Sequence, residues 1–180
     1  MKRRLSILLC LLACLLLAAT ACSALPTAGD PGVVALQPFT QKDFAIRGLI
    51  PNGCREQGPG SFGCPGPEGG EEGMSVVLQQ SMTYRLEALV PVVLAETDLA
   101  AMPDPTGTYR GAALDWTTYE FQTHVASLGP VLFRANLALA ADDSRSYLIA
   151  LVTQPPDYAA NQARYEAIFY HMLYALAPLE

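Results

Sequence analysis

The stretch PNGCREQGPGSFGC, residues 51–64, decides how the folded part of this chain is organised. Gly58-Pro59-Gly60 at its centre is typical of a β-hairpin turn. In a hairpin centred on Pro59, Cys54 and Cys64 lie directly opposite each other, and opposed residues sit ~4.5–5.5 Å apart at Cα, which a disulfide can span. We therefore predict a Cys54–Cys64 disulfide. A redox-active or metal-binding pair is the alternative, although the spacing is not CxxC and no histidine lies nearby.

Further strands are predicted around this hairpin from alternating, β-branched and aromatic residues. They cover residues 42–51, 74–81, 111–123, 131–141 and 146–153. In the third of these, Leu114, Trp116 and Thr118 share one face. The polar turn Asp142-Asp143-Ser144-Arg145 joins the last two strands, which should therefore form an antiparallel hairpin.

Two segments have helical spacing of apolar residues. The first begins at Thr83 and kinks or ends at Pro91. The second covers residues 158–177, ends at Pro178 and has one apolar stripe, formed by Tyr165, Ile168, Phe169, Met172 and Leu176. The sequence thus predicts an α+β domain in which an antiparallel sheet packs against helices.

The first residues, MKRRLSILLCLLACLLLAATAC, have the order of a secretory signal: positive charge, an apolar run, then small residues. The apolar run is shorter than the ~20 residues of a membrane-spanning helix. Ala19-Thr20-Ala21-Cys22 resembles the lipobox of bacterial lipoproteins, although that family usually has Leu where this chain has Ala19. The resemblance implies a diacylglyceryl group on Cys22 and cleavage before it. The alternatives are ordinary signal cleavage, or lipidation at Cys14 after a much shorter apolar core.

The signal pattern and the predicted elements together divide the chain into a signal peptide over residues 1–21, a flexible tether over residues 22–37 and a single domain over residues 38–180. Two acyl chains on one cysteine suffice for stable anchoring. We expect a protein of the cell envelope, held by its lipid at a membrane on the extracytoplasmic side.

The charge of the chain argues against nucleic-acid binding. The full sequence has 11 basic and 17 acidic residues, a net charge of −6. Removing Lys2, Arg3 and Arg4 with the signal leaves a formal charge of −9. A surface this acidic repels phosphate backbones.

The sequence contains no GxSxG, HExxH or P-loop motif and no GxGxxG followed by a helix, so we expect no enzyme, no cofactor and no metal. A hydrolase would need His124 or His171 close to Asp115, Glu120 or a serine. The acidic residues Glu68, Glu71 and Glu72 lack the spacing of a calcium loop. Four aromatic residues are candidates for a ligand or partner surface, although Trp116 fits a core position better; they are Trp116, Tyr119, Tyr170 and Tyr174.

The order of elements is similar to the PsbP-like fold, a curved antiparallel sheet with helices on its faces. The residues that carry the resemblance are Pro51-Asn52-Gly53, Gly111 with Trp116 and Tyr119, the strand through Tyr147 and the terminal helix through Phe169. That family usually has Trp after Pro-x-Gly, where this chain has Cys54. The resemblance implies a fold and no activity, and it transfers no site residue.

The predicted function is a non-catalytic binding or accessory module that docks a protein partner at the membrane surface. The alternative is a small-ligand or solute-binding lipoprotein, which requires a deep and mostly apolar pocket lined by Trp116, Tyr119 or the tyrosines of the terminal helix. An uncharacterised hydrolase is the third hypothesis.

Overall fold

The structure, a computed structural model, describes residues 35–66 and 73–179. These residues lie in one of the two units into which the chain divides, residues 34–180. They form two antiparallel sheets and two α-helices, which confirms the α+β class predicted from the sequence. No helix in the described part of the chain combines the length and apolar character needed to cross a membrane.

The larger sheet has seven strands in the order β3-β4-β5-β9-β8-β7-β6. Its strands are β3 (Arg55–Gly58), β4 (Ser61–Cys64), β5 (Met74–Ser81), β9 (Ser146–Thr153), β8 (Gly129–Ala141), β7 (Asp115–Val125) and β6 (Gly107–Arg110). The smaller sheet consists of β1 (Leu36–Gln41), β2 (Ile46–Pro51) and β10 (Ala177–Pro178), in the order β1-β2-β10.

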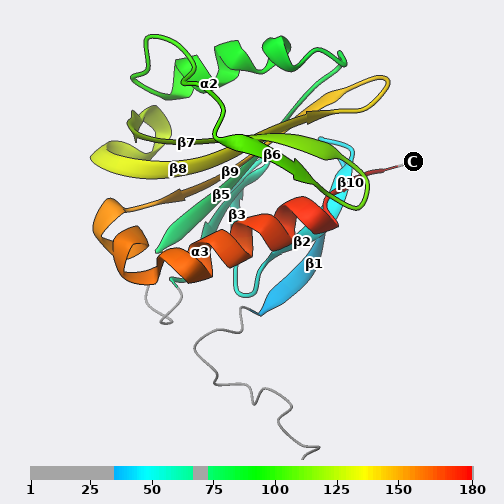
Figure 1. Cartoon of the computed structure of the whole chain (residues 1–180). Helices are drawn as coiled ribbons and strands as arrows, with labels where there is room; N and C mark the ends of the chain where they lie inside the picture. The colour runs from blue at the N-terminus through cyan, green and yellow to red at the C-terminus, as the bar shows by residue number, and fades with distance from the viewer. Residues whose placement is uncertain (1–34, 67–72, 180) are drawn as a thin grey trace, which may run out of the picture. The chain divides into compact units, whose positions relative to one another are not determined.

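The helices are α2 (Val90–Glu96) and α3 (Pro155–Ala175), with 3₁₀ turns at Leu86–Ala88 and Ala126–Leu128. Each α-helix lies over a different face of the large sheet (Figure 1). The long helix α3 and the small sheet cover one face with a core that includes Trp116, Ile149 and Phe169. On the other face a smaller core, which includes Leu89, Leu137 and Leu148, gathers beside the short helix α2.

Residues of the central strands alternate between these two cores. In β9, Ile149 belongs to the core under α3, whereas Leu148 and Ala150 belong to the core beside α2. All eight residues of β9 are buried. This explains why its sequence, SYLIALVT, is apolar at consecutive positions: a strand covered on both faces has no solvent-facing positions to make polar.

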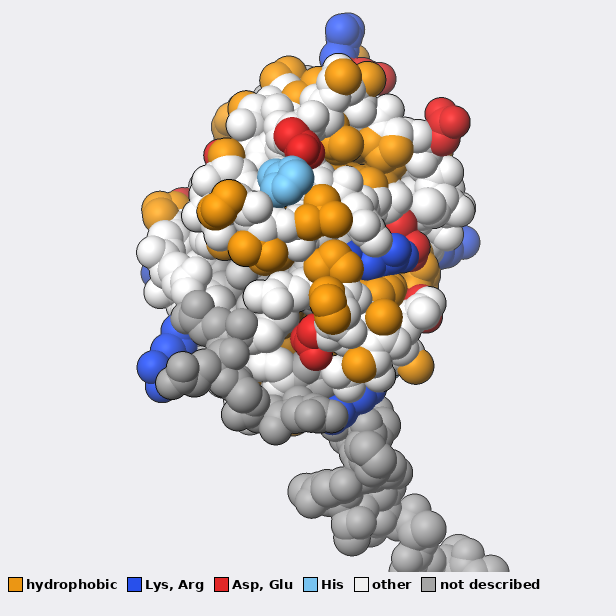
Figure 2. Space-filling model, turned by 90° about the vertical axis from the view of Figure 1, so that its left-hand side faces the viewer, with side chains coloured by type: hydrophobic (Ala, Val, Ile, Leu, Met, Phe, Trp, Pro, Cys, Tyr) orange, Lys and Arg blue, Asp and Glu red, His pale blue; other side chains and the backbone are white. Residues whose placement is uncertain are grey.

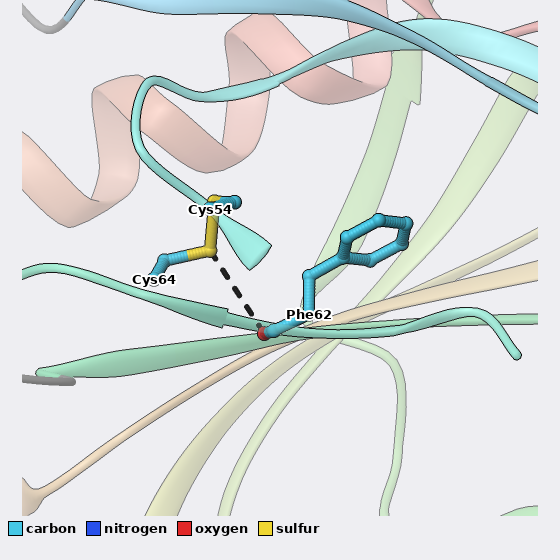
Figure 3. Close-up of a disulfide and its surroundings, with 3 residues drawn as sticks. All are labelled: Cys54, Phe62 and Cys64. Carbon is cyan, nitrogen blue, oxygen red and sulfur yellow. Dashed lines mark hydrogen bonds between the residues drawn. A yellow bond between two sulfur atoms is a disulfide. The ribbon is translucent and has the colours of Figure 1, made fainter. Parts of the chain in front are cut away.

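The hairpin that carries the two cysteines forms as predicted. Arg55 pairs with Gly63 and Glu56 with Phe62, which is the register expected for a turn centred on Pro59. A register shift between Glu56 and Gly58 pairs Gly58 with Ser61, so the turn itself is Pro59-Gly60. Cys54 and Cys64 are joined by a disulfide, and their Cα atoms lie 4.1 Å apart. Figure 3 shows the bond, with the Cys64 sulfur 3.9 Å from the backbone oxygen of Phe62.

Strand β5 has the predicted bounds, and β8 and β9 form the predicted hairpin, with Ala141 opposite Ser146. The Asp142 side chain closes the turn between them, because its Oδ1 accepts the N–H groups of Ser144 and Arg145, both at 2.7 Å. The turn interpretation of Asp142 is therefore confirmed.

The prediction for the first helix was wrong. Pro91 does not kink or end it but occupies its first turn, where no backbone N–H is needed for a hydrogen bond. The preceding residues form the separate 3₁₀ turn Leu86–Ala88. A proline in a helical pattern is compatible with the first turn of a helix as well as with its end, and Pro91 occupies the first turn.

Several strand boundaries also differ from prediction, and two strands, β1 and β6, were not predicted at all. The strand predicted over residues 42–51 starts only at Ile46, because residues 42–45 form a turn in which Ala45 N donates to Lys42 O. The one predicted over residues 111–123 starts at Asp115, and the short polar strand β6 was missed. The first strand starts at Leu36, inside the predicted tether.

The terminal helix spans Pro155–Ala175 rather than residues 158–177, so Pro178 does not end it directly but lies in β10. The signal peptide, Cys22 and the acidic residues Glu68, Glu71 and Glu72 lie outside the described residues.

Candidate functional site

A groove of about 270 Å³ lies between α2 and the face of the large sheet that α2 only partly covers. It is partly open to solvent, and most of its surface is apolar. Its floor crosses the sheet from β4 to β7. The residues that line it are Ser61, Val77, Gln79, Val92, Val93, Glu96, Thr97, Phe121, Thr123, Val125, Ser127, Ala135, Leu137, Leu148, Ala150 and Val152.

The groove exists because the two faces of the sheet are covered by helices of unequal length. Helix α3 has 21 residues, whereas α2 has seven. A seven-residue helix is ~10 Å long at 1.5 Å per residue, so it cannot cover the apolar residues of four neighbouring strands. Two alanines on the floor, Ala135 and Ala150, add space because their side chains are short.

Helix α2 is held against the end of β7 by a small polar cluster. Thr97 forms an isolated β-bridge with Val125. The Thr123 hydroxyl donates to Asp98 Oδ1 at 2.5 Å, and Asp98 Oδ2 lies 2.7 Å from His124 Nδ1. The hydrogen bonds from Thr123 and then His124 lower the pKa of Asp98 to about 2. The carboxylate is therefore ionised at neutral pH, and Nδ1 of His124 carries a proton that it donates to it.

This cluster stands at the rim of the groove. Thr123 lines the groove, but neither Asp98 nor His124 is among the lining residues. Both side chains are about half exposed. Figure 2 shows one face of the molecule, on which a histidine lies beside an acidic side chain and hydrophobic side chains are scattered around them. The His124 imidazole is thus paired with a carboxylate, though with Asp98 and not with Asp115 or Glu120.

A second polar cluster lies on the opposite face, under the first turns of α3. Arg134 Nη2 donates to Glu120 Oε2 at 2.5 Å, and the guanidinium carbon lies 4.3 Å from the centre of the Tyr158 ring. Asn136 donates to the Tyr158 hydroxyl at 3.4 Å. These contacts connect β7 and β8 to α3, and they hold the Arg134 charge between a carboxylate and an aromatic face.

The structure does not bring the four predicted aromatic residues together. Trp116 is 1% exposed and donates from Nε1 to Leu173 O at 3.0 Å, so its assignment to a ligand surface was wrong and its core interpretation is correct. Tyr170 packs beside the same core and Tyr119 beside the core of the other face. Burial raises the pKa of both tyrosines. Only Tyr174 is exposed, at 57%.

The groove residues were not identified from the sequence, although a signal for them exists. Consecutive apolar residues in residues 131–141 and 146–153 indicate strands with two apolar faces, and only one long amphipathic helix is available to cover them. The pairing of Asp98 with His124 has no such signal, because the two residues are 26 positions apart and Asp98 lies in a loop.

The described residues contain no cluster of three or more His, Cys, Asp or Glu side chains that could hold a metal ion. Histidine and cysteine are absent from the groove lining, and its one carboxylate is Glu96. The second histidine, His171, is exposed on α3 with Nδ1 2.6 Å from Ala167 O.

No family model matches this chain, and no curated protein matches it either. Solved structures similar to it include the cyanobacterial PsbP protein (CyanoP) of Synechocystis, with 14% identity and a TM-score of 0.47 over 87% of this chain and 99% of that one. A protein of unknown function from Pseudomonas aeruginosa has 10% identity and a TM-score of 0.42, over 75% of this chain and 94% of that one. A Bacteroides thetaiotaomicron protein has 12% identity and a TM-score of 0.40, over 76% and 46%. Likeness at this level transfers no activity, ligand or partner.

Proposed function

We propose that this protein is a non-catalytic binding module of the cell envelope, whose ligand is a small apolar molecule or chain that enters the groove beside α2. The observation that carries the proposal is the groove itself, a concave and mostly apolar space of about 270 Å³ on the less covered face of the sheet. Ligand sites in proteins have this character: apolar walls with a few polar groups.

The size of the groove is sufficient for a ligand of this kind. An engineered apolar cavity of ~150 Å³ in another protein binds benzene, and the groove is larger. Burial of apolar surface contributes ~25 cal/mol per Å², so a chain that replaces water along Leu137, Ala150 and Val152 would bind without a charged partner. The groove has the mostly apolar lining that the small-ligand hypothesis requires, although Trp116, Tyr119 and the tyrosines of α3 do not line it. The apolar lining favours this hypothesis over the others.

The anchor is proposed on the sequence of residues 1–22. A lipid on Cys22 would keep the domain at a membrane surface outside the cytoplasm, where a diacyl modification suffices for stable attachment. Such a module would take up apolar molecules that are concentrated at or near the membrane.

Docking of a protein partner is the second candidate function. It is favoured by the opening of the groove to solvent, because an apolar side chain of a partner could insert there. A hydrolase is supported least. The serine Ser127 lines the groove, in the 3₁₀ turn Ala126–Leu128, but the histidine His124 lies outside the groove.

The proposal is tested by titrating the purified domain with N-phenyl-1-naphthylamine, a neutral probe that fluoresces in apolar sites. We expect saturable binding that 1-decanol displaces. Ala150→Leu should abolish it by filling the floor of the groove, whereas Ala163→Leu, on an exposed position of α3, should leave it intact. Thermal unfolding verifies that both variants fold. Absence of binding to the wild type, or equal binding by a folded Ala150→Leu variant, would overturn the proposal.

A further inference from the structure

The polar residues of the groove gather at its two ends. The middle of the floor, on β9 and β8, is apolar. Ser61 and Gln79 lie at the end formed by β4 and β5, and both are uncharged. At the opposite end, formed by β7 and the last turn of α2, are Thr123, Ser127 and Glu96.

Glu96 is the one charged residue among those that line the groove. Within residues 35–66 and 73–179, no hydrogen bond or ion pair engages its carboxylate. Lysine, arginine and histidine are absent from the lining. The charge of Glu96 therefore has no counterpart inside the groove.

A second carboxylate reinforces this end. Asp98 lies two residues after Glu96 and is held by the groove residue Thr123, whose hydroxyl donates to Asp98 Oδ1. The other side-chain partner of Asp98 is the His124 imidazole, which is about half exposed.

The physical consequence is an electrostatic preference of the groove. Glu96 is exposed at one end of the groove, so its attraction for a cation has the modest strength of a surface charge pair. The net charge of −6 on the whole chain attracts cations from a distance. An anionic head at this end would be repelled by two carboxylates, whereas a cationic head would be attracted by both.

The shape of the groove defines the rest of the ligand. Its lining runs across five adjacent strands, from β4 to β7. With strands ~4.8 Å apart, this is a span of about 19 Å. A volume of about 270 Å³ spread along that span is narrow, so it suits a slender molecule such as one unbranched chain.

We propose that the groove selects amphipathic cations: an unbranched apolar chain that lies across β9 and β8, with an ammonium head beside Glu96. This inference rests on the proposed function and adds the chemical class of the ligand.

The test compares three ligands with the same chain, decylammonium, decanoate and 1-decanol, as competitors of N-phenyl-1-naphthylamine at low ionic strength and below their micellar concentrations. In the wild type, decylammonium should compete about tenfold more strongly than decanoate, since a favourable and an unfavourable charge contact differ by about this factor near a surface. In Glu96→Gln this ratio should fall below about threefold. Glu87→Gln, an exposed change outside the groove lining, should keep the wild-type ratio.

The outcomes separate the two proposals. If none of the three ligands displaces the probe, the proposed apolar site itself is wrong. If all three displace it with equal strength, or if Glu96→Gln keeps the wild-type ratio, the groove binds apolar chains but does not select cations through Glu96. Loss of the ratio in Glu87→Gln as well would mean that overall charge, and not the groove, causes the preference.

Discussion

Asp98 Oδ2 lies 2.7 Å from His124 Nδ1, and this contact fastens the loop after α2 to the end of β7. Asp98 Oδ1 also accepts the backbone N–H of His124 at 3.2 Å. One carboxylate therefore ties two segments that are 26 residues apart, at the rim of the apolar groove. The contact has a consequence for the acid stability of the domain.

We expect Asp98 to make stability depend on pH in the acid range. Its pKa in the folded state is about 2, below the ordinary 3.8, so the folded protein favours the ionised form. The stabilisation is complete above about pH 4 and is lost as the pH falls towards 2. Asp98→Asn should therefore flatten the fall of unfolding free energy between pH 4 and pH 2, measured by urea denaturation.

Asp104→Asn is the matched control for this measurement, because Asp104 is exposed in the following loop. It should leave the wild-type pH profile unchanged between pH 4 and pH 2. An Asp98→Asn profile that coincides with the wild type would show that the carboxylate does not stabilise the native state.

The disulfide should stabilise the domain by constraining the unfolded chain. Cys54 and Cys64 are ten residues apart, and closing a loop of this size contributes about 2–3 kcal/mol in the chain-entropy model. The double variant Cys54→Ala/Cys64→Ala should lose about that amount in urea denaturation. Under reducing conditions the difference between the two proteins should disappear, and a difference that persists would locate the effect in the packing of Cys64.

The hairpin turn should tolerate a side chain at Gly58 but not at Gly60. Gly60 has φ +71°, and a Cβ atom there would meet the Phe44 ring and lie 2.5 Å from Leu78 O. Gly60→Ala should therefore cost at least about 2 kcal/mol of unfolding free energy. Gly58→Ala, with nothing within 4 Å of its Cβ position, should change it by less than about 0.5 kcal/mol. Equal effects of the two changes would contradict this account.

Trp116 should be necessary for the attachment of α3 to the sheet. Its indole N–H donates to Leu173 O, and the side chain is 1% exposed. Trp116→Phe removes the donor and leaves a cavity, so we expect a loss of about 2–4 kcal/mol, measured by chemical denaturation followed by far-ultraviolet circular dichroism. Binding of N-phenyl-1-naphthylamine should persist in the folded variant, because Trp116 is on the face opposite the groove.

The anchor is tested by the intact mass of the protein recovered from membranes. We expect a chain that begins at Cys22, carries added lipid and gains two hydrogens on reduction of the Cys54–Cys64 bond. The Cys22→Ser variant should no longer be recovered in the membrane fraction. A lipid-free mass for the wild type would contradict the proposed lipid anchor on Cys22 but would leave the proposal for the groove unchanged.

The fold could be predicted where the chain carries local signals. Gly58-Pro59-Gly60 locates the hairpin turn and thereby predicts which cysteines meet, whereas the register shift between Glu56 and Gly58 has no such local signal. The alternation around Trp116 and the stripe of residues on α3 show which faces are buried. Strand β6 and the start of α2 could not be placed this way, because Gly107–Arg110 is short and polar, and a proline is compatible with the start of a helix as well as its end.

The sequence alone determined the class of the domain, the disulfide register and the buried place of Trp116, since each depends on spacing within one or two neighbouring elements. The tertiary structure alone decided where the apolar groove lies. The groove depends on how far the seven residues of α2 extend over β9 and β8, and the contact between Asp98 and His124 depends on where the loop after α2 meets the end of β7. Both are distances between elements that are remote in the chain, and hydrophobic spacing within an element carries no information about them.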